Sequence, residues 1–282
     1  MEYLPSADIE GYVPFPDERA RAYQEAGYWQ NECLHEVLDR IAGADPDATF
    51  LVGPQGELTY GEVVERTRRV ATFLRDELAL DPLDRVVLQL DNRFEFVELL
   101  FGCSRAGVIP VMTLPRHRAA EVEHLIATSG AAAYVTLGTG PGDDFDFTGM
   151  VDRVAGETLD RRVVVGEEPT DEWTEYATVR DTAPSTALLD AIDVNPANPG
   201  LMLLSGGTTG LPKMIPRTHN DYVSQWERWD EVIGGGPEWT TISPLPIAQN
   251  ATLNPVLGGA LMQGGRFVVE PRLETGAILD WI

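Results

Sequence analysis

The 282-residue sequence contains only two cysteines, Cys33 and Cys103, and no long apolar run. Two cysteines cannot form a disulfide framework, and neither lies at a spacing typical of metal ligands, so we expect both to be small buried side chains. The most apolar stretch, residues 99–114, contains Arg105 and is too short to cross a bilayer. The acidic N-terminus does not resemble a signal peptide. These absences predict a cytoplasmic protein with no membrane partner.

Basic residues are also scarce, because 21 Lys and Arg stand against 45 Asp and Glu and give a formal net charge of −24. A surface of this sign repels the phosphates of nucleic acids and of anionic membranes. We therefore expect no nucleic-acid partner and interpret the acidic surface as a source of solubility. A site for a phosphorylated ligand would have to be a local positive spot on this surface.

Apolar runs alternate with amphipathic segments along most of the chain. Strands are expected at residues 49–52, 85–90, 108–111, 132–136, 162–165, 238–243 and 266–269. Helices are expected at residues 92–106, 121–129, 219–233, 253–262 and 274–282, with another starting at the capping-box pattern of Thr59 and Glu62. The alternation implies βαβ units and a mostly parallel sheet, hence an α/β fold.

Two segments allow an expectation about burial. Tyr222, Trp226 and Trp229 recur at helical spacing, which is more typical of a core-facing stripe than of a binding platform. Residues 167–181 are rich in acidic side chains, and we expect them to be solvated.

The most informative segment follows an apolar run that ends at Leu204. It is a loop rich in glycine and hydroxyl groups, and Lys213 closes it. Glycines allow backbone N–H groups to approach an anion, and the hydroxyls and lysine add donors and positive charge. This loop is not the P-loop of common NTPases, because Leu211 and Pro212 separate Gly210 from the lysine. The segment predicts a polyphosphate site, with an ordinary turn after a buried strand as the alternative.

The flanks of the loop favour the polyphosphate site. Residues 205–213 and the following run Ile-Pro-Arg-Thr-His-Asn-Asp-Tyr at 215–222 resemble the phosphate loop of adenylate-forming enzymes, the acyl/aryl-AMP ligase superfamily. The 216–222 extension is most similar to the branch that activates 2,3-dihydroxybenzoate and salicylate. Residues 58–62 and 100–111 resemble two structural signatures of the same superfamily. The resemblance implies the N-terminal AMP-binding domain of that fold, with ATP and Mg2+ as cofactors.

The resemblance also implies which residues form the site. It assigns the β- and γ-phosphates and the leaving pyrophosphate to Ser205, Gly206, Gly207, Thr208, Thr209, Gly210 and Lys213. His219 is a further candidate, with a helix-cap or core histidine as the alternative. Attack of a carboxylate on ATP needs no protein nucleophile, so we expect no catalytic residue and no protein-bound metal in this chain. The catalytic lysine of the superfamily is expected in a C-terminal part beyond residue 282.

Residues 246–251 occupy the place of a further signature, which forms the acid pocket. Asn250 matches an asparagine that contacts the ortho substituent or the carboxylate of the aryl acid. Gln249 stands where the aryl-acid branch usually has histidine, and Ala251 stands where it usually has tyrosine. We therefore expect an acid that is bulkier than dihydroxybenzoate or differently substituted. The alternative is that Gln249 and Asn250 merely end a strand.

The sequence is thus identified as an incomplete N-terminal AMP-binding domain over residues 1–282, with a first βαβ part at 1–195 and a phosphate-loop and acid-pocket part at 196–282. The full enzyme would adenylate an aryl acid and load it onto the phosphopantetheine of an aryl carrier protein, for siderophore or nonribosomal peptide biosynthesis. The chain alone is expected to be inactive, since family members continue well beyond Ile282. An acyl-CoA ligase of the same superfamily and a non-catalytic ligand-binding fragment are the two alternatives.

Overall fold

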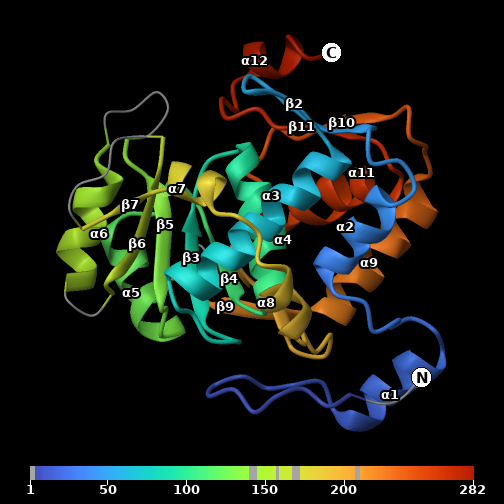
Figure 1. The fold of residues 1–282 in the computed structure, drawn as a ribbon, viewed down its shortest axis with the longest axis horizontal. Helices are drawn as coiled ribbons and strands as arrows, with labels where there is room; N and C mark the ends of the chain where they lie inside the picture. The colour runs from blue at the N-terminus through green and yellow to red at the C-terminus, as the bar shows by residue number, and fades with distance from the viewer. Residues whose placement is uncertain (1–3, 140–144, 157–158, 167–171, 207–209) are drawn as a thin grey trace.

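The computed structural model describes residues 4–139, 145–156, 159–166, 172–206 and 210–282. These residues form a seven-stranded sheet in the order β7-β6-β5-β3-β4-β8-β9 and a four-stranded sheet in the order β10-β11-β1-β2. Figure 1 shows the two sheets with helices packed around and between them, and the two termini at opposite ends of the molecule. The predicted α/β class with mostly parallel pairing is confirmed.

The larger sheet is parallel except at one edge. Its parallel strands are β3 (Arg85–Gln89), β4 (Ile109–Thr113), β5 (Ala133–Leu137), β6 (Arg161–Val165), β7 (Thr174–Glu175) and β8 (Pro199–Leu204). The edge strand β9 (Met214–Thr218) pairs antiparallel with β8 and was not expected from the sequence. Pro216 is tolerated there because the outer side of an edge strand needs no ladder hydrogen bond.

The smaller sheet combines strands from distant parts of the chain. Its members are β1 (Thr49–Gly53), β2 (Gly56–Thr59), β10 (Thr240–Ile242) and β11 (Arg266–Val268). Strand β11 pairs in parallel with both β1 and β10, whereas β1 and β2 form an antiparallel hairpin. Both sheets therefore draw strands from residues 1–195 and from residues 196–282, so the two parts interleave within one fold.

Local sequence signals set several helix boundaries. The Thr59 hydroxyl accepts from the Glu62 N–H at 3.2 Å, and the Glu62 carboxylate accepts from the Thr59 N–H at 2.8 Å, which confirms the predicted capping box. Gly107 ends α4 in the left-handed conformation, with φ of 70°. The helices are α1 (Asp17–Glu25), α2 (Leu34–Ala42), α3 (Tyr60–Thr72), η1 (Phe73–Glu77), α4 (Phe94–Ala106), α5 (Ala119–Ser129), α6 (Phe147–Ala155), α7 (Ala177–Asp181), α8 (Thr186–Ala191), α9 (His219–Ile233), α10 (Asn250–Thr252), η3 (Leu253–Gly258), α11 (Gly259–Met262) and α12 (Thr275–Leu279).

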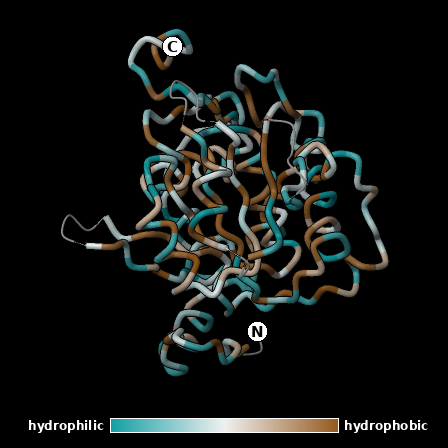
Figure 2. Tube along the Cα trace, turned by 90° about the vertical axis from the view of Figure 1, so that its left-hand side faces the viewer, coloured by the Kyte–Doolittle hydropathy of each residue, from teal (hydrophilic) through white to brown (hydrophobic). Residues whose placement is uncertain are grey.

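The core lies around α4, whose residues are buried along its whole length. Figure 2 shows hydrophobic segments running through the middle of the molecule, with hydrophilic segments towards its periphery. The cysteines, Cys33 and Cys103, are buried as expected. The expectation of a solvated segment at 167–181 holds in part over the described residues 172–181: Glu172 and Asp181 are exposed, whereas Trp173 and Tyr176 pack into the core. Among the described residues, no helix is both long and apolar enough to cross a membrane.

Candidate active site

The glycine-rich loop connects the antiparallel strands β8 and β9. Ser205 and Lys213 close its base with two hydrogen bonds: the Ser205 N–H donates to the Lys213 carbonyl at 2.9 Å, and the Lys213 N–H donates to the Ser205 hydroxyl at 3.0 Å. Gly206, Gly210 and Lys213 are exposed. Three of the predicted phosphate-binding residues, Gly207, Thr208 and Thr209, lie outside the described residues. Lys213 thus lies exposed at the loop end of the β8–β9 hairpin.

The glycines at the two ends of this loop are not required by packing. A Cβ atom added at Gly206 or Gly210 would meet no atom within 4 Å. Lys213 is the only lysine in the sequence, since every other member of the Lys and Arg set is an arginine. A small exposed loop with one compact cation is suited to a polyanionic ligand that approaches from solvent.

Helix α5 contacts the C-terminal end of the loop through His124. The His124 Nε2 atom lies 3.2 Å from the Pro212 carbonyl oxygen, and its Nδ1 atom lies 3.3 Å from the Thr128 hydroxyl. In one tautomer of the ring, Nε2 donates to the Pro212 carbonyl and Nδ1 accepts from the Thr128 hydroxyl. The sequence analysis missed this contact, because it joins residues 88 positions apart.

His219 lies in the protein interior. Its Nδ1 atom accepts from the Leu34 N–H at 3.4 Å, at the first turn of α2, and the ring packs directly against Gly200. Burial lowers the pKa of His219 to about 3, so the ring is neutral and can accept at Nδ1. This geometry agrees with the alternative role given to His219 in the sequence analysis, that of a core histidine. Its ring accepts from an N–H group at the start of a helix, which has no partner within that helix.

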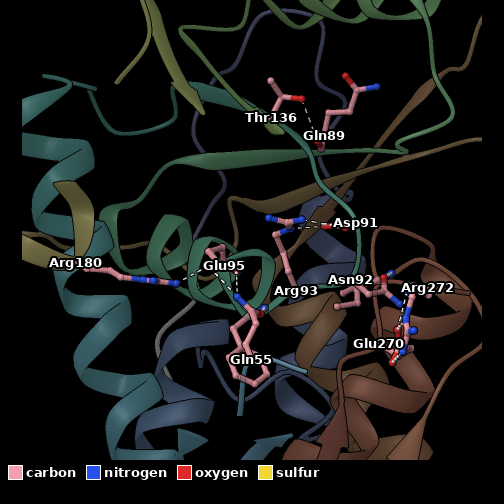
Figure 3. A network of polar contacts seen from close by, with 12 residues as sticks. Gln55, Gln89, Asp91, Asn92, Arg93, Glu95, Thr136, Arg180, Glu270 and Arg272 are labelled. Carbon is pink, nitrogen blue, oxygen red and sulfur yellow. Dashed lines mark hydrogen bonds and ion pairs between the residues drawn. The ribbon is translucent and has the colours of Figure 1, made fainter. Parts of the chain in front are cut away.

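The acid-pocket segment is held against the end of strand β3 by a buried asparagine. The Asn92 amide accepts from the Ile247 N–H at 2.7 Å and donates to the Leu245 carbonyl at 3.1 Å. The hydroxyls of Ser243 and Thr252, 2.7 Å apart, close the same segment from the other side. Figure 3 shows Asn92 and the neighbouring Asp91–Arg93 pair on the segment that leaves β3.

Gln249 lines a cleft of about 450 Å³ between the two sheets. The cleft lies beyond the carboxyl ends of strands β3 and β4, where ligands of parallel α/β sheets usually bind. Apolar and charged side chains share its wall: Leu114, Phe147, Leu245, Asp91, Arg116 and Arg118. Burial raises the pKa of Asp91, although the Arg93 guanidinium pairs with it and opposes that shift.

Asn250 and Ala251 begin helix α10 and are exposed. The Tyr222 hydroxyl of α9 donates to Oδ1 of Asn250 at 3.0 Å. Because α9 follows β9 directly, it joins the phosphate-loop hairpin to the acid-pocket segment. Of the expected aromatic stripe, Tyr222 and Trp226 are buried as predicted, whereas Trp229 is 39% exposed.

The model of the AMP-binding enzyme family matches residues 38–282. The chain belongs to this family. A Streptomyces protein named salicylyl-CoA synthase / salicylate adenylyltransferase is 38% identical over 280 residues, covering 96% of this chain and 50% of that protein. The salicyl-AMP ligase / salicyl-S-ArCP synthetase of Mycobacterium tuberculosis is 40% identical over 227 residues, covering 78% of this chain and 39% of that protein.

One solved structure is similar to nearly the whole of this chain. The apo structure of Mycobacterium smegmatis MbtA superposes with a TM-score of 0.87 and 35% identity, covering 96% of this chain and 50% of that one. The chain thus spans about half, or less, of the length of the relatives described here. The match extends over both sheets, so the resemblance inferred from a few motifs holds along nearly the whole chain.

Proposed function

We propose that this AMP-binding domain binds ATP and an aryl carboxylic acid and takes part in joining them into an aryl-adenylate. The observation that carries the proposal is the hairpin loop whose base is closed by Ser205 and Lys213. The names of the two relatives support an aryl acid such as salicylate as the class of substrate. ATP as a substrate also makes the cytoplasm the proposed location.

In the proposed reaction, a carboxylate oxygen attacks the α-phosphorus of ATP. The bond between the α-phosphorus and the oxygen that bridges it to the β-phosphorus breaks. Pyrophosphate leaves with the electron pair, and the loop residues would stabilise its charge by hydrogen bonds and by the Lys213 ammonium group. Ser205, the glycine N–H groups, Thr208 and Thr209 are the proposed donors. Mg2+ would enter with ATP, held by phosphate oxygens and water.

We propose that the acid binds at the segment containing Gln249, Asn250 and Ala251. The Asn250 amide is exposed, and the Gln249 side chain lines the cleft beside it. An amide can donate to a carboxylate or to an ortho oxygen of the ring. Ala251 leaves room for a ring system bulkier than dihydroxybenzoate.

We propose a carrier-protein phosphopantetheine thiol as the acceptor of the aryl group. The name of the mycobacterial relative, which includes salicyl-S-ArCP synthetase, supports this acceptor. The Streptomyces relative carries CoA in its name, so CoA is the acceptor to compare.

The test is ATP–pyrophosphate exchange by the 282-residue chain with salicylate, dihydroxybenzoates, anthranilate and bicyclic aryl acids, together with calorimetric binding of non-hydrolysable aryl-adenylate analogues. Exchange that depends on an aryl acid supports the full proposal. Binding of an analogue without exchange supports the ligand-binding-only alternative for this chain. If the chain shows no exchange with any aryl acid and binds no analogue, the proposed function is overturned.

A further inference from the structure

Tyr222 and Asn250 meet where α9 packs against the start of α10. The Tyr222 hydroxyl donates to Oδ1 of Asn250 at 3.0 Å. Tyr222 is fully buried, and the Arg217 guanidinium lies 5.3 Å from the centre of its ring, whereas Asn250 is exposed. The buried tyrosine is therefore the fixed partner, and the exposed amide is the group whose orientation it sets.

The phenol proton determines which way the amide points. Burial raises the pKa of Tyr222, so the hydroxyl keeps its proton and needs an acceptor. Oδ1 of Asn250 is that acceptor, which leaves the NH2 group of the amide to face outward. Rotation of the amide by 180° would deprive the phenol proton of its acceptor, an arrangement disfavoured by about tenfold or more.

We propose that Tyr222 is a positioning residue: it holds the Asn250 amide with its NH2 group towards the acid, and thereby selects an ortho oxygen over an ortho amine. This inference rests on the proposed function, in which Asn250 contacts the ortho substituent. In an ortho-hydroxy acid, the hydroxyl proton bonds to the neighbouring carboxyl oxygen, so a lone pair is left to accept from Asn250. An ortho amine keeps an outward N–H, and two donors would then face each other.

The experiment compares two ligands that differ only at the ortho position, the non-hydrolysable sulfamate analogues of salicyl-adenylate and anthraniloyl-adenylate. Their dissociation constants are measured by calorimetry on the 282-residue chain and on Tyr222→Phe. The wild-type chain is expected to prefer the salicyl analogue by about tenfold or more, and Tyr222→Phe to lower this preference by about tenfold, because the amide can then rotate. A merely structural role would weaken both ligands equally and leave their ratio unchanged.

Tyr134→Phe is the matched control. The Tyr134 hydroxyl also donates from a buried position to a side-chain amide, Oε1 of Gln89 at 2.7 Å, but it lies within the larger sheet. This variant is expected to keep the wild-type preference. An equal loss of preference in Tyr134→Phe would overturn the inference, because the effect would not then belong to the Asn250 contact.

A second measurement tests the contact without a ligand. The shift of the urea unfolding midpoint in Tyr222→Phe/Asn250→Ala is expected to be smaller than the sum of the two single shifts, because both single changes remove the same hydrogen bond. Additive shifts would overturn the inference. The inference would also be overturned if Tyr222→Phe bound both analogues with the wild-type ratio of dissociation constants. That result would leave the proposed function intact. Binding of neither analogue by the wild-type chain would overturn the proposed function and this specificity with it.

Discussion

Lys213 is the residue on which the proposed function depends most directly. It is the only lysine in a chain with a net charge of −24, and it lies exposed at the end of the glycine-rich loop. We expect Lys213→Ala to lower the affinity for Mg-ATP by about 10- to 100-fold, the value of one charge-assisted hydrogen bond. Calorimetric titration with Mg-ATP measures the change.

The matched control for Lys213 is Arg228→Ala, which removes an exposed cation paired with Glu231 on α9 and should leave the affinity unchanged. The single lysine allows an independent check. An amine-acylating reagent can modify only Lys213 and the N-terminal amine, and Mg-ATP should protect Lys213 alone. Equal labelling with and without Mg-ATP would contradict a nucleotide at this loop.

Ala251 is expected to set the size of the accepted acid. It is exposed at the start of α10, so a tyrosine can be placed there without entering the core. We expect Ala251→Tyr to weaken binding of a bicyclic aryl-adenylate analogue by about tenfold while the salicyl analogue is retained, since the ring would occupy the space beside Asn250. Ala251→Ser is the control for the substitution itself. An unchanged profile of acids in Ala251→Tyr contradicts the size argument.

The neutral His219 makes stability depend on pH. Its pKa is about 3 in the folded chain because of burial, against about 6.5 when unfolded. Between these values only the unfolded chain binds the proton, so the free energy of unfolding falls as the pH decreases below about 6.5. From pH 7.5 to 5.0, this group is expected to remove about 2 kcal/mol, at about 1.4 kcal/mol per pH unit.

His219→Asn isolates this contribution, because an amide oxygen can still accept from the Leu34 N–H without titrating. Urea unfolding at the two pH values should show a smaller loss in the variant than in the wild-type chain. The pKa of His35 is also lowered, first by burial and then by the charge of Arg105, so part of the loss should remain. Identical pH dependence of the two proteins would show that His219 is not neutral in the folded state.

At the scale of elements, the π-helical segment η3 packs closely against α9 at Gly258. A Cβ atom at Gly258 would lie 2.0 Å from Cδ1 of Trp226, a fully buried side chain of α9. Gly259 has almost the same backbone angles, yet a Cβ atom there meets nothing within 4 Å. We expect Gly258→Ala to lower the free energy of unfolding by about 1–3 kcal/mol, the usual cost of overpacking.

Gly259→Ala is the matched control, and we expect it to leave stability unchanged or to raise it by up to about 1 kcal/mol, since alanine favours a helix. Chemical unfolding of both variants measures the difference. Equal effects of the two substitutions would mean that α9 and η3 do not pack closely through Trp226.

The contrast between these elements indicates how much the sequence could predict. The start of α3 and the end of α4 were predicted because Thr59, Glu62 and Gly107 act within one helical turn. Strand β9 was missed because an edge strand with a proline has no periodic apolar pattern. Residues 253–262 were expected to form one regular helix, and the π-helical turn η3 within them was missed.

The candidate site divides in the same way. The glycine-rich loop and the segment with Asn250 could be found from residue types, because their chemistry is carried by consecutive residues. The contacts that hold them could not, because each joins residues far apart in the sequence: Asn92 with Ile247, His124 with Pro212 and Tyr222 with Asn250.

At the scale of the whole molecule, the connection of the strands makes the fold one cooperative unit. Strands β8 and β9 from residues 196–282 complete the edge of the larger sheet beside β4. Strand β11 from the same part lies between β1 and β10 in the smaller sheet. Neither sheet can therefore be completed by residues 1–195 alone, and strand β1 would lose β11, the partner that covers its edge opposite β2.

We therefore expect residues 1–195, expressed alone, to show no cooperative thermal transition, while the 282-residue chain unfolds in a single transition. Circular dichroism follows both sheets, and tryptophan fluorescence reports on side chains from both parts, so the two signals should change at the same temperature in the whole chain. A cooperative transition of the fragment near the temperature of the whole chain would contradict this expectation, because it would mean that residues 1–195 form their own core. Restoring residues 196–282 as a second polypeptide should recover the transition only if β8 and β11 enter their sheets, which makes the recovered amplitude a measure of that assembly.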